Sequence, residues 1–153
     1  MRLAKPDIKR YVLSMGQSTV VSGSGQIICF GLGSCIGVFL YDKFKGIGAG
    51  AHVMLPESPG SPNNIIDCLI QDMLNMGCNA WAIRARLVGG ADVMKMTSFQ
   101  IGRKNIDYIQ KKLSHNKIMI QAMEVGGDMY RTARMDIQSG ILWVNSGKKI
   151  TTI

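Results

Sequence analysis

Two apolar runs separated by a glycine turn constrain the fold of this chain more than any other feature. Residues 27–32 are mostly apolar, and residues 36–41 are apolar and rich in residue types favoured in strands. Short apolar runs bounded by turn residues predict buried β-strands. Gly33 and Ser34 form the turn between the runs, and Cys35 stands at its tip. The sequence therefore predicts two buried strands joined by a turn that carries a cysteine.

Two amphipathic helices are predicted later in the chain. Asn63 or Asn64 is positioned to cap a helix that runs to about Met76, and Gly77 suits the position just after its end. A second helix is predicted over residues 100–113, where apolar residues recur at helical spacing.

Short strands account for most of the remaining residues. A glycine- and alanine-rich segment over residues 47–55 carries His52, and Ser139-Gly140 predicts the turn of a hairpin. Proline, serine and glycine predict a loop over residues 56–62. Further strands are expected over residues 11–15, 19–22, 81–88, 118–125, 129–137 and 141–144. Two helices and about eight strands predict an α+β fold in which helices cover sheet faces.

Length and composition indicate one globular domain over residues 1–153. The chain is 46% hydrophobic and 18% charged, and no stretch rich in Pro, Gly or Ser divides it. No apolar stretch of about 7–15 residues follows the basic N-terminus, so no secretory signal is expected. No run of about 18 apolar residues occurs, so no membrane insertion is expected either.

The net charge of +8 favours an acidic partner. The positive residues are dispersed along the chain, and no basic motif interleaved with aromatic residues is present. A nucleic-acid partner is therefore not favoured, whereas an acidic protein surface fits the charge.

The four cysteines give no sign of a metal site. Cys29, Cys35, Cys68 and Cys78 form no Cys-x-x-Cys pair and no Cys/His pattern with zinc-site spacing. Their apolar surroundings indicate reduced, mostly buried thiols, as in a cytoplasmic protein.

Cys35 and His52 are the candidate catalytic pair. A free cysteine is only a few per cent thiolate near neutral pH, so it needs a base to act as a nucleophile. His52 is one of two histidines in the chain, and the turn over residues 43–46 is able to bring it alongside Cys35. Successive backbone N–H groups in the Gly33-Ser34 turn are able to form an oxyanion hole. From these residues alone, a buried structural thiol and a core histidine remain equally open.

Glycine pairs mark two further turns, Gly89-Gly90-Ala91 and Gly126-Gly127. Such turns bind phosphate in some proteins, but neither follows the P-loop or dinucleotide spacing. The favoured interpretation is that they are tight turns where neighbouring backbones approach closely.

Several motifs follow one another in order from about residue 27 onward. They are Leu32-Gly33-Ser34-Cys35, Gly46-Ile47-Gly48, His52-Val53-Met54-Leu55-Pro56, Gly89-Gly90-Ala91, Ile101-Gly102-Arg103-Lys104-Asn105, Val125-Gly126-Gly127 and the hairpin from Asp136 to Ser139-Gly140. With this ordered set the chain resembles the chemoreceptor glutamine deamidase family, CheD. A lone Gly-Ser-Cys is a weak signal, whereas the whole set with its Cys-to-His interval is specific.

The resemblance implies a cytoplasmic chemotaxis enzyme. Such enzymes hydrolyse particular glutamine side chains on the helical cytoplasmic region of chemoreceptors to glutamate, with release of ammonia. Cys35 is implied as the nucleophile that forms a thioester, His52 as the general base, and Gly33 and Ser34 as oxyanion donors. The ion pair with His52 is expected to lower the pKa of Cys35.

The resemblance also implies a fold and a partner. The implied fold is that of toxin-type cysteine glutamine deamidases, with packed, sandwich-like β-sheets flanked by two main α-helices in the layer order α/β/β/α. A CheC-type phosphatase of the chemotaxis response regulator is implied as a partner, and no metal or organic cofactor is implied.

Two positions depart from the family pattern. The family usually has a histidine-orienting threonine six residues before the nucleophile, and Cys29 stands there instead. A thiol is a weaker hydrogen-bonding group than a hydroxyl, so the alternative is a weakly active or inactive module that binds chemoreceptors or a CheC-type phosphatase. Tyr130 stands where a glycine is common and is expected to reshape the nearby surface. A redox role for Cys29 and Cys35 is least favoured, because six extended residues span up to about 20 Å.

Overall fold

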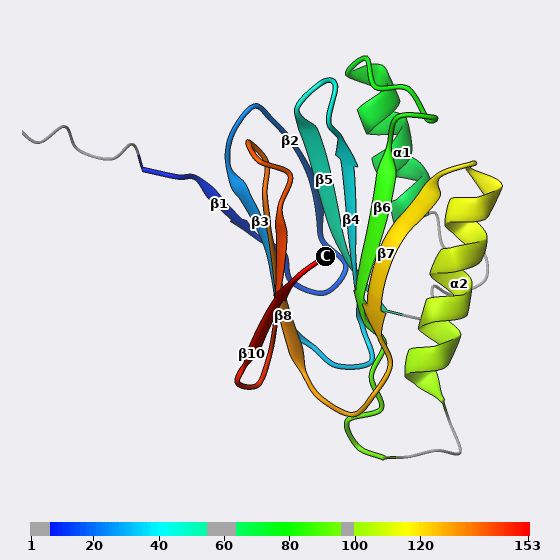
Figure 1. The fold of residues 1–153 in the computed structure, drawn as a ribbon. Coiled ribbons are helices and arrows are strands. Elements are labelled where there is room, and N and C mark those ends of the chain that lie inside the picture. Colours follow the sequence, from blue (N-terminus) through cyan, green and yellow to red (C-terminus); the bar gives the residue numbers. More distant parts are fainter. Residues whose placement is uncertain (1–6, 55–63, 96–99) are drawn as a thin grey trace, which may run out of the picture.

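Two five-stranded β-sheets pack face to face, and two helices cover the far face of one of them (Figure 1). The computed structural model describes residues 7–54, 64–95 and 100–153. The outer sheet contains, in order, β1 (Arg10–Val12), β3 (Gln26–Leu32), β8 (Arg131–Asp136), β9 (Leu142–Ser146) and β10 (Lys149–Thr152). The central sheet contains, in order, β2 (Ser18–Ser22), β5 (Ile47–Val53), β4 (Ile36–Asp42), β6 (Arg84–Gly89) and β7 (Met119–Val125).

Strand β4 is the middle of the central sheet and is antiparallel to both neighbours, β5 and β6. The pair β6 and β7 is parallel, because helix α2 (Ile101–His115) forms the crossover between them. Helix α1 (Ile65–Asn75) connects β5 to β6. Local connections therefore join β4, β5, β6 and β7, whereas β2 pairs with β5 after the chain has passed through β3 of the outer sheet.

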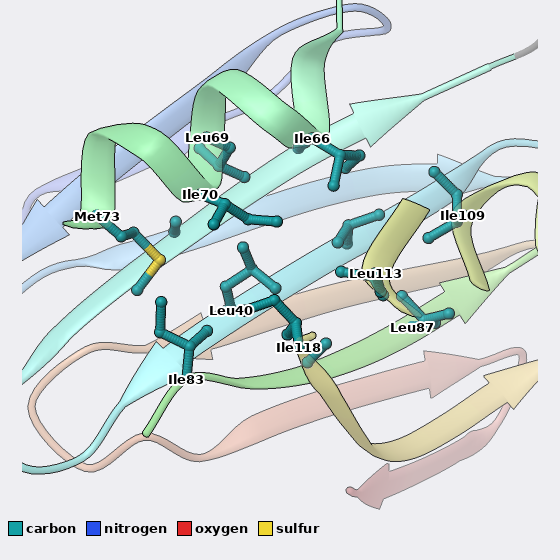
Figure 2. Close-up of a cluster of buried hydrophobic side chains, with 14 of the residues drawn as sticks. Leu40, Ile66, Leu69, Ile70, Met73, Ile83, Leu87, Ile109, Leu113 and Ile118 are labelled. Atoms are coloured by element: carbon teal, nitrogen blue, oxygen red, sulfur yellow. The ribbon is translucent and has the colours of Figure 1, made fainter. Parts of the chain in front are cut away.

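Successive side chains of β4 point to opposite faces of the sheet, so they belong to two different cores. Ile36, Val38 and Leu40 face the helices, whereas Phe39 faces the outer sheet. The helix-side core, seen in Figure 2, joins these strand residues to the buried faces of α1 and α2. The helices contribute Ile66, Leu69, Ile70, Met73, Ile106, Ile109 and Leu113. The inter-sheet core lies on the opposite side and includes Cys29, Leu32, Cys35, Met135 and Val144.

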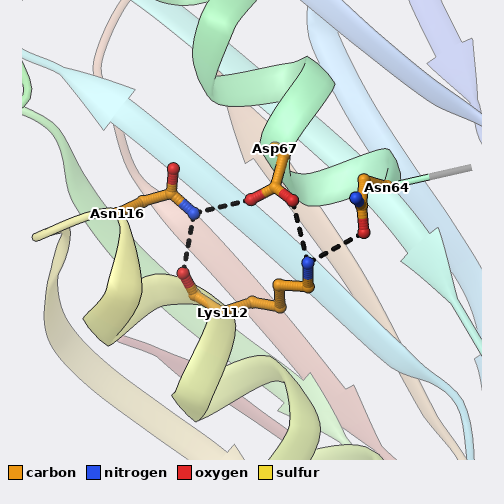
Figure 3. A network of polar contacts seen from close by, with 4 residues as sticks. All are labelled: Asn64, Asp67, Lys112 and Asn116. Atoms are coloured by element: carbon orange, nitrogen blue, oxygen red, sulfur yellow. Dashed lines mark hydrogen bonds and ion pairs between the residues drawn. The ribbon is translucent and has the colours of Figure 1, made fainter.

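A polar network joins the start of α1 to the end of α2 (Figure 3). Lys112 Nζ donates to Asp67 Oδ2 and to Asn64 Oδ1, both at 2.8 Å, and Asn116 Nδ2 donates to Asp67 Oδ1 at 2.7 Å. Asn64 occupies the N-cap position of α1, but its side chain forms no capping hydrogen bond because it accepts from Lys112 instead. Gly77 has a φ of +97° just after the helix, as predicted.

The expected layer order α/β/β/α is wrong. Both described helices pack on the central sheet and share one core, so the layers run β/β/α (Figure 1). Helix α1, between β5 and β6, and helix α2, between β6 and β7, both lie on this side. The prediction of an α+β fold with two helices and packed sheets is confirmed for the described residues.

Most predicted strands are present, with shifted ends. Strand β10 was not predicted, because its residues Lys149–Thr152 are polar or charged except Ile150. The strand expected from residue 81 begins at Arg84, since the residues before it form a turn that leaves Trp81 exposed. The loop predicted over residues 56–62, and Asn63 as a cap, lie outside the described residues. Within the described ranges, no helix is both long and apolar enough to span a membrane.

Candidate functional site

Cys35 lies at one end of the central sheet, directly before β4. Its side chain belongs to the inter-sheet core and is only 7% exposed. Cys35 also lines a pocket of about 260 Å³, together with Gly33 and Ser34. The predicted nucleophile therefore borders a pocket while most of its surface is shielded from solvent.

Three hydrogen bonds to successive carbonyls hold the turn that carries Cys35. Backbone N–H groups of the turn after β6 donate to the carbonyls of Gly33 at 2.8 Å and of Cys35 at 2.9 Å. Between them, the Asn105 side-chain amide on α2 donates to the Ser34 carbonyl at 2.6 Å. Asn105 is buried. The turn is thus fixed from two sides, by backbone and by one amide side chain.

Glycines allow this close approach. A Cβ on Gly89 would overlap the carbonyl oxygen of Cys35, and a Cβ on Gly102 would overlap the backbone of Gly90 and Ala91. Neither position accommodates a larger residue unless the backbone moves. The interpretation of Gly89-Gly90 as a tight turn that admits a neighbouring backbone is therefore confirmed.

The anchored carbonyls determine where the neighbouring N–H groups point. In a trans peptide, the C=O of one residue and the N–H of the next lie on opposite sides of the chain. The carbonyls of Gly33 and Ser34 point toward their anchors, so the N–H groups of Ser34 and Cys35 point away from them. Two adjacent N–H groups fixed in this way are what an oxyanion hole requires. Gly33 is also a candidate donor, but these bonds fix no direction for its N–H group.

Strand register brings His52 to the same face as Cys35. On β5, His52 pairs with Gly37 of β4. Residues two apart on a strand share a face, so Cys35 is the diagonal neighbour of His52, at a typical backbone spacing of about 7–8 Å. His52 is buried, at 7% exposure. Among the described hydrogen bonds, none joins the two side chains.

The imidazole of His52 is oriented by a backbone carbonyl. Its Nδ1 lies 3.0 Å from the carbonyl oxygen of Leu13, in the segment between β1 and β2. A carbonyl only accepts hydrogen bonds, so Nδ1–H is the donor, and in the neutral imidazole this tautomer leaves the lone pair on Nε2. Backbone bonds from Gly16 N–H to the His52 carbonyl, at 2.8 Å, and from His52 N–H to Gln17, at 3.0 Å, hold this segment in place. His52 is therefore prepared to accept a proton at Nε2.

Cys29 and Cys35 both lie in the inter-sheet core as free thiols. Burial, with a further contribution from Cys35, raises the pKa of Cys29 to about 12. Burial also raises the pKa of Cys35, although a hydrogen bond from its own backbone N–H opposes this. This direction is opposite to the lowering expected from an ion pair with His52. Burial therefore disfavours the thiolate form of both cysteines.

Exposed apolar side chains surround the pocket. The ring of Tyr130 lies close to Gly33, where an added Cβ would come within 2.9 Å of it. Tyr130 forms part of the pocket wall, and its effect on the surface relative to a glycine stays a prediction. Other wall residues that are at least one-third exposed are Met15, Met54, Met94 and Ile101. Leu55 and Pro56, from the motif that begins at His52, lie outside the described residues.

Comparison with known proteins decides the family. The model of the family described as CheD chemotactic sensory transduction matches residues 54–146. A relative from Clostridium tetani, named probable chemoreceptor glutamine deamidase CheD, is 34% identical over 92% of this chain and 93% of its own length. The chain belongs to the CheD family. The chemoreceptor glutamine deamidase CheD of Thermotoga maritima is 31% identical over 87% of this chain and 89% of its own length.

Two CheD site residues were not found by sequence reasoning. Asn105 was quoted as part of a motif, but its bond to the Ser34 carbonyl was not foreseen. Leu13 gave no signal at all, because it acts through a carbonyl that every residue possesses. No group of three or more His, Cys, Asp or Glu side chains able to hold a metal ion occurs in the described ranges.

Proposed function

We propose that this protein is a chemoreceptor glutamine deamidase, which hydrolyses receptor glutamine side chains to glutamate with release of ammonia. The observation that carries the proposal is the Cys35 turn. A thiol lines a pocket, its neighbouring carbonyls are anchored, and an oriented histidine lies on the same sheet face.

The first half of the reaction forms a thioester. Cys35 Sγ attacks the glutamine carboxamide carbon, and the N–H groups of Ser34 and Cys35 stabilise the oxyanion that develops. Because burial raises the pKa of Cys35, the thiol proton has to leave as the attack proceeds. His52 Nε2 accepts that proton, and the Leu13 carbonyl stabilises the resulting imidazolium through Nδ1–H.

The second half releases both products. His52 donates its proton to the leaving nitrogen, so the C–N bond breaks and ammonia departs. His52 then removes a proton from water, which attacks the thioester carbon. The C–S bond breaks, the thiol is restored, and the substrate side chain leaves as glutamate.

The proposed substrate region is the helical cytoplasmic part of chemoreceptors, and the proposed location of the protein is the cytoplasm. The exposed apolar wall around Cys35, with Met15, Met94 and Tyr130, suits the apolar side chains that flank a glutamine on a helix. A CheC-type phosphatase is proposed as a second partner. Co-elution with a purified CheC-type phosphatase, lost on Tyr130→Glu, would support that partner.

Mass spectrometry tests the reaction directly. After incubation with a receptor cytoplasmic fragment, we expect a gain of about 1 Da at particular glutamines. Cys35→Ala should abolish the gain, since it removes the nucleophile. Cys68→Ala is the matched control, because Cys68 is an exposed thiol on α1. Deamidation that persists in Cys35→Ala would contradict the mechanism.

A binding module with little catalysis is the second candidate, motivated by Cys29. Because the Leu13 carbonyl already orients His52, we expect Cys29→Thr to change the deamidation rate by less than about threefold, since a buried hydroxyl adds one modest hydrogen bond at most. A large increase in Cys29→Thr would favour the binding module as the function of the natural chain.

A further inference from the structure

The end of the central sheet opposite Cys35 carries a second pocket with different chemistry. This pocket is about 550 Å³ and is bordered by the end of β4 and the start of β6. Its wall contains Lys43, Phe44, Trp81, Arg84 and Arg86 but no Asp or Glu. Its size falls in the range of about 300–1,000 Å³ that is usual for ligand sites.

Arg86 is a buried cation that forms no ion pair with an Asp or Glu side chain of the described residues. It is 5% exposed, and its guanidinium donates to the main-chain oxygens of Ile153, the last residue of the sequence, and of Gly140, both at 2.8 Å, and to the sulfur of Met135. Its Nε has no hydrogen-bond partner. Since Lys43 and Arg84 lie in the same wall, this unsatisfied N–H and the two further cations favour an acidic group nearby.

Two exposed aromatic rings form a shelf beside these cations. Phe44 and Trp81 are 67% and 68% exposed, and their ring centroids lie 5.9 Å apart. Lys43 Nζ lies 5.2 Å from the centre of the Phe44 ring, and Arg84 donates to the Trp81 carbonyl at 2.6 Å. Aromatic rings of this size are rarely left exposed together, so the shelf suits an apolar group carried next to a negative charge.

The type of anion follows from the groups that remain free. The two acids at this end are engaged by their own turns: Asp42 accepts from the N–H groups of Phe44 and Lys45, and Asp136 accepts from Ser139. The backbone N–H groups of Phe44, Lys45 and Ser139 are therefore not available for the backbone cradle that phosphate often uses. The side-chain cations remain, and a carboxylate is the simplest anion that pairs with them without such a cradle.

We propose that this pocket binds a carboxylate attached to an aromatic or aliphatic body, with the charge toward Arg84 and Arg86 and the body on Phe44 and Trp81. The carboxylate has two sources, a free organic acid or an acidic side chain on a protein segment. The proposal does not depend on the deamidase function, because the pocket lies at the opposite end of the sheet from Cys35.

Fluorescence of Trp81 provides the test. The chain has two tryptophans, so Trp143→Phe leaves Trp81 as the sole reporter. Cys35→Ala is added so that glutamine-containing controls are not deamidated. Phenylacetate and the peptide acetyl-Glu-Phe-Glu-amide are titrated against phenylacetamide and acetyl-Gln-Phe-Gln-amide at low salt. We expect saturable quenching by at least one acid, with a Kd below about 2 mM, and none by the neutral analogues.

The peptide and phenylacetate titrations distinguish the two sources of the carboxylate, and substitutions in the pocket wall locate the binding site. Binding of the peptide indicates a protein segment, and binding of phenylacetate alone indicates a free acid. Arg84→Gln should weaken binding about tenfold and Lys43→Gln about threefold, as expected for charge-assisted contacts. Arg134→Gln is the matched control, because Arg134 lies over Trp143 on the outer sheet, 4.9 Å from its ring centre.

Three results would overturn the proposal. They are equal binding of an acid and its amide, no binding of either acid up to about 10 mM, and unchanged affinity in both Arg84→Gln and Lys43→Gln. Lys43 is a surface residue, so the last result is interpretable even if Arg84→Gln does not fold.

Discussion

The two ends of the central sheet are built by different means. At the Cys35 end, backbone carbonyls, glycines and one neutral amide hold the turn, and the titratable groups include a thiol and an imidazole. At the opposite end, Asp42, Asp136 and Arg86 hold the turns through charged side chains. The comparison shows that close backbone packing fixes the geometry at one end, whereas charged side chains do so at the other.

Replacing His52 should have the largest effect on the Cys35 end. His52→Gln keeps a hydrogen-bonding group but removes the base, so we expect the deamidation rate to fall by about 10²–10⁴-fold. The rate is measured by mass spectrometry on a receptor fragment. Phenylacetate binding at the opposite end should be unchanged, and a loss there as well would show that the two ends are not independent.

Iodoacetamide should react much faster with Cys35 than with Cys29. A pKa of about 12 for Cys29 leaves roughly one part in ten thousand as thiolate at pH 8. Cys35 has a raised pKa too, but it borders a pocket, so its alkylation should be measurable and should accelerate with rising pH up to and beyond pH 9. Peptide mapping after iodoacetamide treatment follows each cysteine separately.

Equal labelling of Cys29 and Cys35 in the native protein would contradict this assignment. The exposed Cys68 serves as an internal standard, because its labelling reports the reagent rather than the fold. Labelling in denaturant should be the same for all the cysteines, since unfolding removes the burial that raises the pKa.

Replacing one glycine at each end by alanine compares the two ends, because the two glycines have the same φ. Gly90 and Gly46 both have a φ of +62°, but a Cβ on Gly90 would lie 2.6 Å from Ile106, whereas one on Gly46 meets nothing within 4 Å. Gly46→Ala should therefore cost about 1 kcal/mol in the free energy of unfolding, from backbone strain alone. Gly90→Ala should cost about 2–4 kcal/mol, because overpacking adds to the strain.

Urea unfolding measures both variants. A larger cost at Gly46 than at Gly90 would show that the turn after β6 yields more easily than the contacts around it suggest. In that case a rigid turn after β6 would not be what holds the Cys35 turn in place.

Sequence periodicity predicted much of the fold because local patterns determine it. Apolar runs located β3 and β4, helical spacing located α1 and α2, and Ser139-Gly140 located the last predicted hairpin. The layer order could not be predicted in this way, because both faces of β4 are apolar: Phe39 and Leu40 are equally buried on opposite sides. An apolar strand does not reveal which face is covered by helices.

Part of the candidate site was predicted from residue types. Cys35 and His52 carry side chains with distinctive chemistry, so the sequence suggested a nucleophile and a base before the register of their strands was known. The Leu13 carbonyl and the Asn105 amide act through tertiary contacts that connect distant segments. No local pattern encodes such contacts, and the buried Arg86 was missed because burial of a cation is visible only in three dimensions.

Arg86→Met tests whether the opposite end contributes to stability without contributing to catalysis. The change removes hydrogen bonds to the carbonyls of Ile153 and Gly140 but also removes a buried charge. These effects oppose each other, so we expect a net cost of about 1–2 kcal/mol. Deamidation of a receptor fragment should stay within about twofold of the natural protein, and a tenfold loss would tie Arg86 to the Cys35 end.

The smallest expected effect concerns the network between the helices, which belongs to neither end. Although burial raises the pKa of Asp67, hydrogen bonds from Lys112 and Asn116 outweigh it and lower that pKa. A lowered folded-state pKa stabilises the protein above the unfolded value of about 3.9 and is lost as pH falls through the folded value. Asp67→Asn should therefore cost about 1 kcal/mol at pH 7 and less at a pH well below the unfolded value.

Urea unfolding at the two pH values measures the effect of Asp67→Asn, and Asp72→Asn on the same helix is the control for a change of charge alone. The network also bears on the site, because α2 carries both Lys112 and Asn105. If the charged network positions α2 against the Cys35 turn, Asp67→Asn will slow deamidation as well. We expect no such change, since Ile109 and Leu113 of α2 are fully buried in the helix-side core and hold the helix against the central sheet.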